Sequence, residues 1–209
     1  MINQKIVQKE NNMNYPDFFN TIETIKLQDP LSNLLGTFEN GIVEFSYLDV
    51  VKNAGHSCPT VAGAYLLALE GLKELYKDET PMRGEIFVSF KEDSSEGVAG
   101  VIANVLSHIT GATESLGFKG LNGNFVRHDL MKFNDSINSS IKLQRLDTGK
   151  TIELIYNPSS IGQNPQVGTL MQKIMQNIAT PEEKKLFGTL WQERVENIFK
   201  NIPQVISVV

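Results

Sequence analysis

The chain of 209 residues contains a single cysteine, Cys58. One cysteine excludes an intrachain disulfide and any zinc finger built from several cysteines. Histidine is nearly as scarce, with three residues in the chain, and one of them, His56, stands two positions before that cysteine. These two scarce residue types therefore meet in one short segment, Gly55-His56-Ser57-Cys58-Pro59.

The sequence also lacks long apolar runs and clusters of positive charge. No apolar stretch approaches the length that spans a bilayer, and the N-terminal segment MINQKIVQKENNMNY has no apolar targeting core. The net charge is −5, and no run of lysine or arginine reaches four residues. We therefore expect a cytoplasmic protein that binds no nucleic acid and no membrane. The 41% of hydrophobic residues is sufficient for a globular core.

The segment around Cys58 has the pattern of a helix start. Proline suits the first helical position, because it has no N–H to leave unpaired and its φ is already set. Pro59 therefore places Cys58 at the N-cap, where free backbone donors and the positive end of the helix dipole favour a thiolate. His56 is close enough in sequence to act as a metal co-ligand or as a base. The alternative is that Cys58 is simply a small buried hydrophobe and His56 an ordinary polar residue.

Hydrophobic spacing predicts the other elements. We expect helices over residues 15–26, 31–35, 48–53 and 61–76, a helix from a capping box at 93–96 to 109, and two C-terminal helices over 167–178 and 181–199. We expect extended segments over 41–47, 85–90, 125–133, 141–146 and 151–156. His108 falls in the last turn of a helix, where a protonated imidazole would interact favourably with the helix dipole. His128 falls on the inward face of the strand expected over 125–133.

This order of elements predicts the α+β class, with a mixed sheet and helices on one face. The residues also resemble the FmdE family, which takes its name from formylmethanofuran dehydrogenase. The resemblance rests on Leu48-Asp49-Val50-Val51 with the Gly-His-Ser-Cys-Pro segment, then on the blocks beginning at Thr110, Gly120 and Asp129. It implies an α-β-α-β-β-β core similar to the C-terminal domain of glyceraldehyde-3-phosphate dehydrogenase. That core would cover residues 42–156, between helical extensions over 1–41 and 157–209.

Four positions depart from the family pattern, namely Ala54, Thr60, Asn104 and Ala112. Ala112 stands where the family usually has a second cysteine, so a dithiol is absent. The C-terminal helices stand where a cysteine-rich zinc module would be. What the chain retains is His56 and Cys58.

Three functions follow as hypotheses. The first is a metal-binding protein or metalloenzyme in which Cys58 and His56 hold a divalent ion, for which Zn²⁺ is the first choice. His128 or a carboxylate would be a further ligand. An open position would accept water or a small-molecule ligand. The second, which the family name implies, is an accessory or interaction protein of a redox complex. The third is an enzyme with Cys58 as nucleophile and His56 as base. The apolar stripes of the C-terminal helices exceed what one sheet face needs, so we also expect a homodimer.

Overall fold

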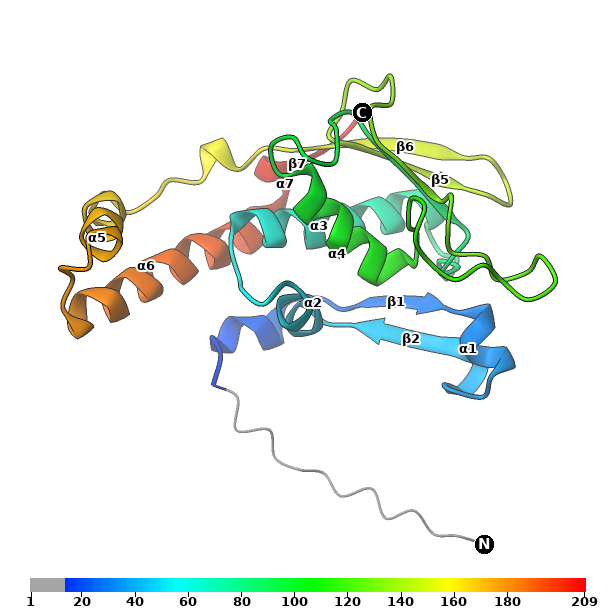
Figure 1. Cartoon of the computed structure of the whole chain (residues 1–209), viewed down its shortest axis with the longest axis horizontal. Coiled ribbons are helices and arrows are strands. Elements are labelled where there is room, and N and C mark those ends of the chain that lie inside the picture. The colour runs from blue at the N-terminus through cyan, green and yellow to red at the C-terminus, as the bar shows by residue number, and fades with distance from the viewer. Residues whose placement is uncertain (1–13) are drawn as a thin grey trace, which may run out of the picture.

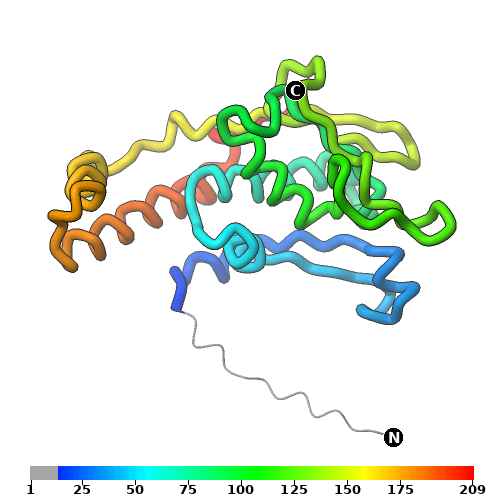
Figure 2. Tube along the Cα trace, viewed as in Figure 1, coloured from blue at the N-terminus to red at the C-terminus, as the bar shows by residue number. Residues whose placement is uncertain are grey.

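The computed structural model describes residues 14–209, and Figures 1 and 2 show the path of the chain. Its α-helices are α1 (Pro30–Leu34), α2 (Tyr47–Ala54), α3 (Pro59–Tyr76), α4 (Ala99–Thr110), α5 (Gln166–Met175), α6 (Pro181–Lys200) and α7 (Ile202–Val205). Its strands are β1 (Ile25–Gln28), β2 (Ile42–Phe45), β3 (Ile86–Phe90), β4 (Met131–Lys132), β5 (Ile141–Arg145), β6 (Thr151–Tyr156) and β7 (Ile206–Val208). Short 3₁₀ helices cover Asp17–Thr21, Glu39–Gly41 and Pro158–Ser160.

The main sheet has five strands in the order β4-β3-β5-β6-β7. Strands β3 and β4 are parallel, and the other three neighbouring pairs are antiparallel. The sheet is therefore mixed, and together with the helices at both ends it confirms the α+β class. From α3 to β6 the order is helix, strand, helix and three strands, as the sequence predicts.

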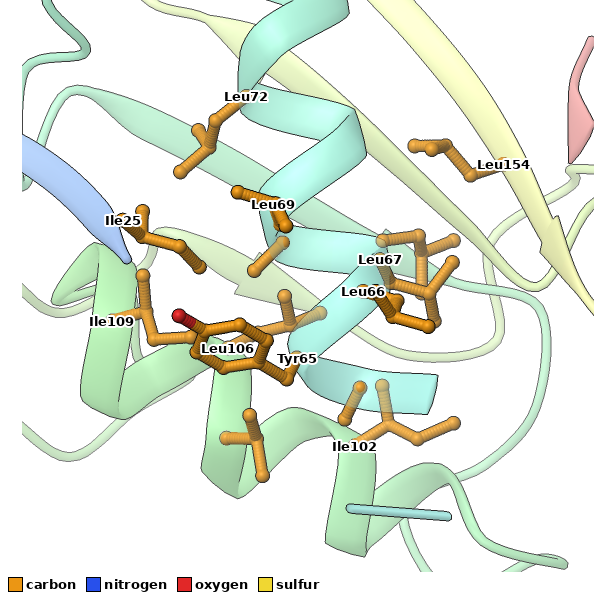
Figure 3. Packing of buried hydrophobic residues seen from close by; sticks show 14 of the residues in the cluster. Ile25, Tyr65, Leu66, Leu67, Leu69, Leu72, Ile102, Leu106, Ile109 and Leu154 are labelled. Atoms are coloured by element: carbon orange, nitrogen blue, oxygen red, sulfur yellow. The ribbon is translucent and has the colours of Figure 1, made fainter. Parts of the chain in front are cut away.

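Helix α3 is the centre of the molecule. It lies between the five-stranded sheet and a separate two-stranded sheet made of β1 and β2, with α4 beside it (Figure 1). Figure 3 shows its side chains between Leu154 of β6 on one side and Ile25 and Ile109 on the other. Such a helix must be apolar on nearly all faces, and its sequence from Val61 to Leu69 is buried without a break.

Two expected elements are wrong. In place of a helix over 15–26, the chain forms the 3₁₀ helix and then β1, in which Ile25 and Leu27 are buried and Lys26 is exposed. Pairing of β1 with β2 satisfies its backbone, and this tertiary contact overrides the helical spacing of the apolar residues. The expected strand over 125–133 is reduced to β4, because Phe125 (φ 61°) and Asp129 (φ 56°) have left-handed backbone that no strand accepts.

A third expectation needs a smaller correction. The predicted capping box at 93–96 forms a turn, in which the Asp93 carboxylate accepts the Ser95 N–H (2.9 Å). Helix α4 begins only at Ala99, after Gly97 with φ 51°.

The terminal segments pack into the same core as the central part. Phe19 and Ile25 from one end and Val195, Ile198 and Ile206 from the other belong to one buried cluster. The predicted C-terminal helices are confirmed as α5 and α6, and α6 begins with a capping box between Thr180 and Glu183. Strand β7 was not predicted. Residues 1–13 of the expected N-terminal extension lie outside the described residues.

Helices α5 and α6 form an arm that projects from the body (Figures 1 and 2). Over residues 14–209, no helix is long and apolar enough to cross a membrane.

Candidate functional site

The segment that carries His56 and Cys58 is a tight turn between α2 and α3. Helix α2 starts with a capping box in which Ser46 and Asp49 satisfy each other's backbone N–H groups, and it ends at Gly55. Gly55 has φ 76° and donates its N–H to the Val51 carbonyl (2.8 Å). Only glycine adopts this conformation without strain, so it stops α2 and turns the chain toward α3.

Cys58 is the N-cap of α3, as the sequence predicts. Its backbone is extended (φ −150°), and its Sγ accepts the N–H of Val61 at 3.5 Å. The thiol is half-buried. The Tyr47 and Tyr156 hydroxyls lie near it, and burial raises the pKa of both above the ordinary value; a negative charge on Cys58 raises them further. The sulfur therefore lies at the positive end of a helix, where one backbone N–H donates to it.

The turn is anchored by residues far away in the sequence. The Ser57 carbonyl accepts hydrogen bonds from Trp191 Nε1 (3.3 Å) and Gln192 Nε2 (3.1 Å), both on α6. The Ser57 hydroxyl contacts the Tyr47 hydroxyl (2.9 Å). The contacts with α6 join positions 134 and 135 residues apart, so no local sequence pattern reveals them.

Strand β6 adds a further anchor. The Tyr156 hydroxyl donates to the Pro59 carbonyl at 2.6 Å, and its ring lies against Gly63. The absence of a side chain at Gly63 makes room for the tyrosine ring. A Cβ on Gly63 would lie 2.2 Å from the ring.

His56 is exposed, and a hydrogen bond sets the position of its ring. Nδ1 lies 3.0 Å from the Ala54 carbonyl, so Nδ1 carries the proton and Nε2 has a free lone pair. This arrangement is typical of histidines that bind metal through Nε2. His56 also borders a cavity of about 450 Å³ between the end of α2 and α4, and the other residues that line it are Asn53, Ala54, Val101, Asn104, Val105, Ser107 and His108.

His108 is the functional candidate that sequence reasoning undervalued. It lies in the last turn of α4, as predicted, but it also faces the same cavity as His56. Burial lowers the pKa of its imidazole, the Arg83 charge lowers it further, and Asp49 opposes the shift. Its Nε2 is buried and has no hydrogen-bond partner among the residues that the structure describes. Only the fold brings it close to α2.

His128 is not inward-facing. Because the strand expected around it is absent, its side chain is about one-third exposed, and Nδ1 lies 2.6 Å from the carboxylate of Asp129. From residue 14 onward, no group of three or more histidine, cysteine, aspartate or glutamate side chains is arranged to hold a metal ion. The structure therefore does not assemble His128 with His56 and Cys58 into such a group.

The comparisons with known proteins agree with the resemblance. No curated protein matches the chain significantly. One family model does match, described as "FmdE, Molybdenum formylmethanofuran dehydrogenase operon", and the match covers residues 54–206. This range contains the His-x-Cys-Pro turn, strands β3 to β6 of the main sheet and the C-terminal arm, and it is most of the chain. The protein therefore belongs to the FmdE family.

Proposed function

We propose that the protein binds a divalent metal ion, with Zn²⁺ the first choice, through His56 and Cys58. The observation that carries the proposal is the hydrogen bond of His56 Nδ1 to the Ala54 carbonyl, which leaves Nε2 as the ligand atom. A cysteine and a histidine are ligands that zinc prefers. Family membership adds support, because the match includes both residues.

The residues present fit a partial ligand set. Cys58 Sγ has one backbone donor, the Val61 N–H at 3.5 Å, which is compatible with a thiolate. Two protein ligands leave two of four positions open, whereas a catalytic zinc site has three protein ligands and one open position, so the proposal needs one further protein ligand. Water, a bound substrate or another side chain would occupy those positions. His128 stays a predicted ligand, and its Nε2 would be the ligand atom because Nδ1 is hydrogen-bonded to Asp129.

A metal bound there would act as a Lewis acid on a substrate oxygen or on water. The chain's own part would be to orient the two ligands. The Ala54 carbonyl orients the His56 ring. Trp191 of α6 donates a hydrogen bond to the carbonyl of Ser57, the residue between the two ligands in the chain. These contacts restrict the conformations of the turn that carries the two ligands.

The nucleophile hypothesis fits less well. It needs a hydrogen bond between Cys58 and His56, so that the imidazole can take the thiol proton. In the structure the two side chains have different partners, Val61 N–H for Cys58 and the Ala54 carbonyl for His56.

The test is the metal content of protein purified without a histidine tag. We expect about one zinc per chain after zinc loading and dialysis, measured by mass spectrometry of the element. Cys58→Ala and His56→Ala should each lose stoichiometric zinc and keep the far-ultraviolet circular dichroism of the wild type. Glu193→Ala, a change at an exposed position of α6, is the control and should keep the metal.

Full zinc content in both ligand variants, or none in the wild type at any pH, would reject the site. His128→Ala in the same measurement tests the predicted third ligand, which would weaken zinc binding if it is one. The expected pH dependence is a steep loss of zinc on acidification, because protons compete for both the thiolate and the imidazole.

A further inference from the structure

Asparagine is followed directly by glycine at two places in the chain, Asn40-Gly41 and Asn122-Gly123. Both asparagines have left-handed backbone, with φ 55° at Asn40 and φ 49° at Asn122. Because glycine has no Cβ, its backbone nitrogen is open to the side-chain amide carbon of the preceding asparagine. The two pairs therefore have the same intrinsic chemistry, and their surroundings decide whether the nitrogen can reach that carbon.

The fold holds the first pair in place. The Gly41 N–H donates to the Phe38 carbonyl (3.0 Å), and the Gly41 carbonyl accepts the Asp29 N–H (2.7 Å). Gly41 is buried, and a Cβ there would lie 2.4 Å from the Asp29 carbonyl oxygen. The Gly41 nitrogen is thus bonded and packed, so it cannot turn toward the side chain of Asn40.

The second pair is open to solvent. It lies in the loop between α4 and β4, where Leu121, Asn122, Gly123 and Asn124 are all exposed. Within residues 14–209, the Gly123 N–H has no hydrogen-bond acceptor, and a Cβ on Gly123 would meet nothing within 4 Å. Two reciprocal hydrogen bonds between Leu121 and Asn124, both 2.9 Å, close the turn. An exposed turn with so few contacts opens at a small cost in free energy.

We propose that Asn122 is a site of spontaneous deamidation through a cyclic imide with Gly123. The Gly123 backbone nitrogen attacks Cγ of Asn122 and forms a new N–C bond. The bond from Cγ to Nδ2 breaks, and ammonia leaves with the proton from the backbone nitrogen. Water then opens the ring, at the side-chain carbonyl to give aspartate or at the main-chain carbonyl to give isoaspartate. Water is the co-reactant, and nothing is oxidised or reduced.

Both products change the loop. Each adds one negative charge to a chain whose net charge is −5. Isoaspartate also adds a methylene group to the main chain, so the reciprocal hydrogen bonds of Leu121 and Asn124 cannot both keep their geometry. The reaction uses neither His56 nor Cys58, so it is independent of the proposed metal site.

The test follows the two pairs in one sample of the full chain, incubated in mildly alkaline buffer. Proteolytic digestion and mass spectrometry should show a gain of about 1 Da at the modified residue, and fragmentation separates Asn122 from Asn124. We expect Asn122 to convert about tenfold or more faster than Asn40 in the folded protein, with isoaspartate among the products. In urea the two rates should become similar, because the fold no longer protects Asn40.

Two glycine variants test the attacking nitrogen. Gly123→Ala should slow conversion of Asn122, because a Cβ obstructs the approach of the nitrogen to Cγ. The matched control is Gly149→Ala, at another exposed glycine with positive φ (74°) and nothing within 4 Å of its Cβ position. It should leave the rate at Asn122 unchanged.

Three results would overturn the proposal. The first is a folded protein in which Asn122 converts no faster than Asn40. The second is a product that contains aspartate without isoaspartate, because direct hydrolysis of the amide gives aspartate alone. The third is an unchanged rate at Asn122 in Gly123→Ala.

Discussion

Gly63 is the residue at which α3 comes closest to the sheet. Its missing side chain makes room for the Tyr156 ring, whose hydroxyl then reaches the Pro59 carbonyl at the start of the same helix. A methyl group at position 63 would meet a rigid ring at 2.2 Å, and the ring cannot move without losing its hydrogen bond. One glycine thus determines how β6 supports the turn that carries His56 and Cys58.

We expect Gly63→Ala to destabilise the protein by about 1–3 kcal/mol, measured by urea unfolding, because it overpacks this contact. The matched control is Gly188→Ala on α6, where a Cβ meets nothing within 4 Å. That change should stabilise by about 0.5–1 kcal/mol, since alanine favours the helix. Equal effects of the two substitutions would contradict the role of the Tyr156 contact.

Asp29 is a second residue whose contacts stabilise the folded state. It is the N-cap of α1, and its carboxylate also pairs with Arg83 (2.9 Å) and Arg127 (2.8 Å). Burial alone would raise its pKa, but the Ser32 N–H and the two guanidinium groups outweigh burial and hold the pKa below its ordinary value. A lowered pKa means that the ionised carboxylate stabilises the folded state at neutral pH.

We expect Asp29→Asn to cost about 3–5 kcal/mol of unfolding free energy at pH 7, because Arg127 is buried and loses its counter-ion. Asparagine is an equally good N-cap, so the change tests the charge and not the helix start. The stability that Asp29 adds is fully present above its unfolded pKa, near 3.8, and disappears as the pH falls through the lower folded pKa. The difference between wild type and variant in urea unfolding should therefore shrink below pH 4. A difference independent of pH would contradict this assignment.

At the scale of elements, α6 is the support of the candidate site. Trp191 and Gln192 both donate to the Ser57 carbonyl, which lies between the two proposed metal ligands. The same helix contributes Val195 and Ile198 to the main core, so its position is well determined. A C-terminal element is thus required for the geometry of a turn near residue 57.

We expect the double variant Trp191→Phe, Gln192→Ala to weaken zinc binding by about tenfold, in the range seen when supporting groups of a metal site are removed. Phenylalanine keeps most of the contact with Phe187, so the helix should stay in place. Zinc affinity is measured by competition with a chelating dye, and Glu193→Ala is again the control. An unchanged affinity would show that α6 has only a structural role.

The elements also show where sequence patterns mislead. The apolar residues at 18, 19, 22 and 25 have helical spacing, but β2 offers β1 a hydrogen-bonding partner, and pairing decides the outcome. Apolar and polar residues alternate over the segment 125–133 as they do in a strand, yet Phe125 and Asp129 have positive φ. The alternation of hydrophobicity contains no information about these backbone angles. By contrast, the cap at Cys58, the helix from residue 181 and the extended segments of β5 and β6 depend on neighbouring residues, and these predictions are confirmed.

At the scale of the whole molecule, the outer part of the arm of α5 and α6 has a small core of its own, separate from the main core. A small buried cluster of Val167, Leu170 and Leu190 holds its two helices together. Apolar side chains remain exposed at its outer end, Met175 at 68% and Ile178 at 63%. A second copy of the chain would cover them.

We propose, as the sequence predicts, that the protein is a homodimer that pairs through this arm. Light scattering at micromolar concentration should give twice the chain mass. Met175→Glu with Ile178→Glu should give the mass of one chain, because two charges would enter the interface. Gln172→Glu, an exposed position on α5, is the control and should stay dimeric. A wild type with the mass of one chain would contradict the proposal.

The α+β class, the Cys58 cap and the end of α2 before Gly55 follow from the sequence alone, because helix ends, turns and amphipathic stripes depend on residues close together in the chain. Strand β1, the partly buried position of His128 beside Asp129 and the contacts of Ser57 with α6 follow only from tertiary packing. Packing also places His108 of α4 beside the cavity that His56 borders, since His56 lies in the turn before α3 and the chain between the two residues includes α3 and β3. Contacts between distant segments depend on how all the elements pack together, and no local pattern of residues contains that information.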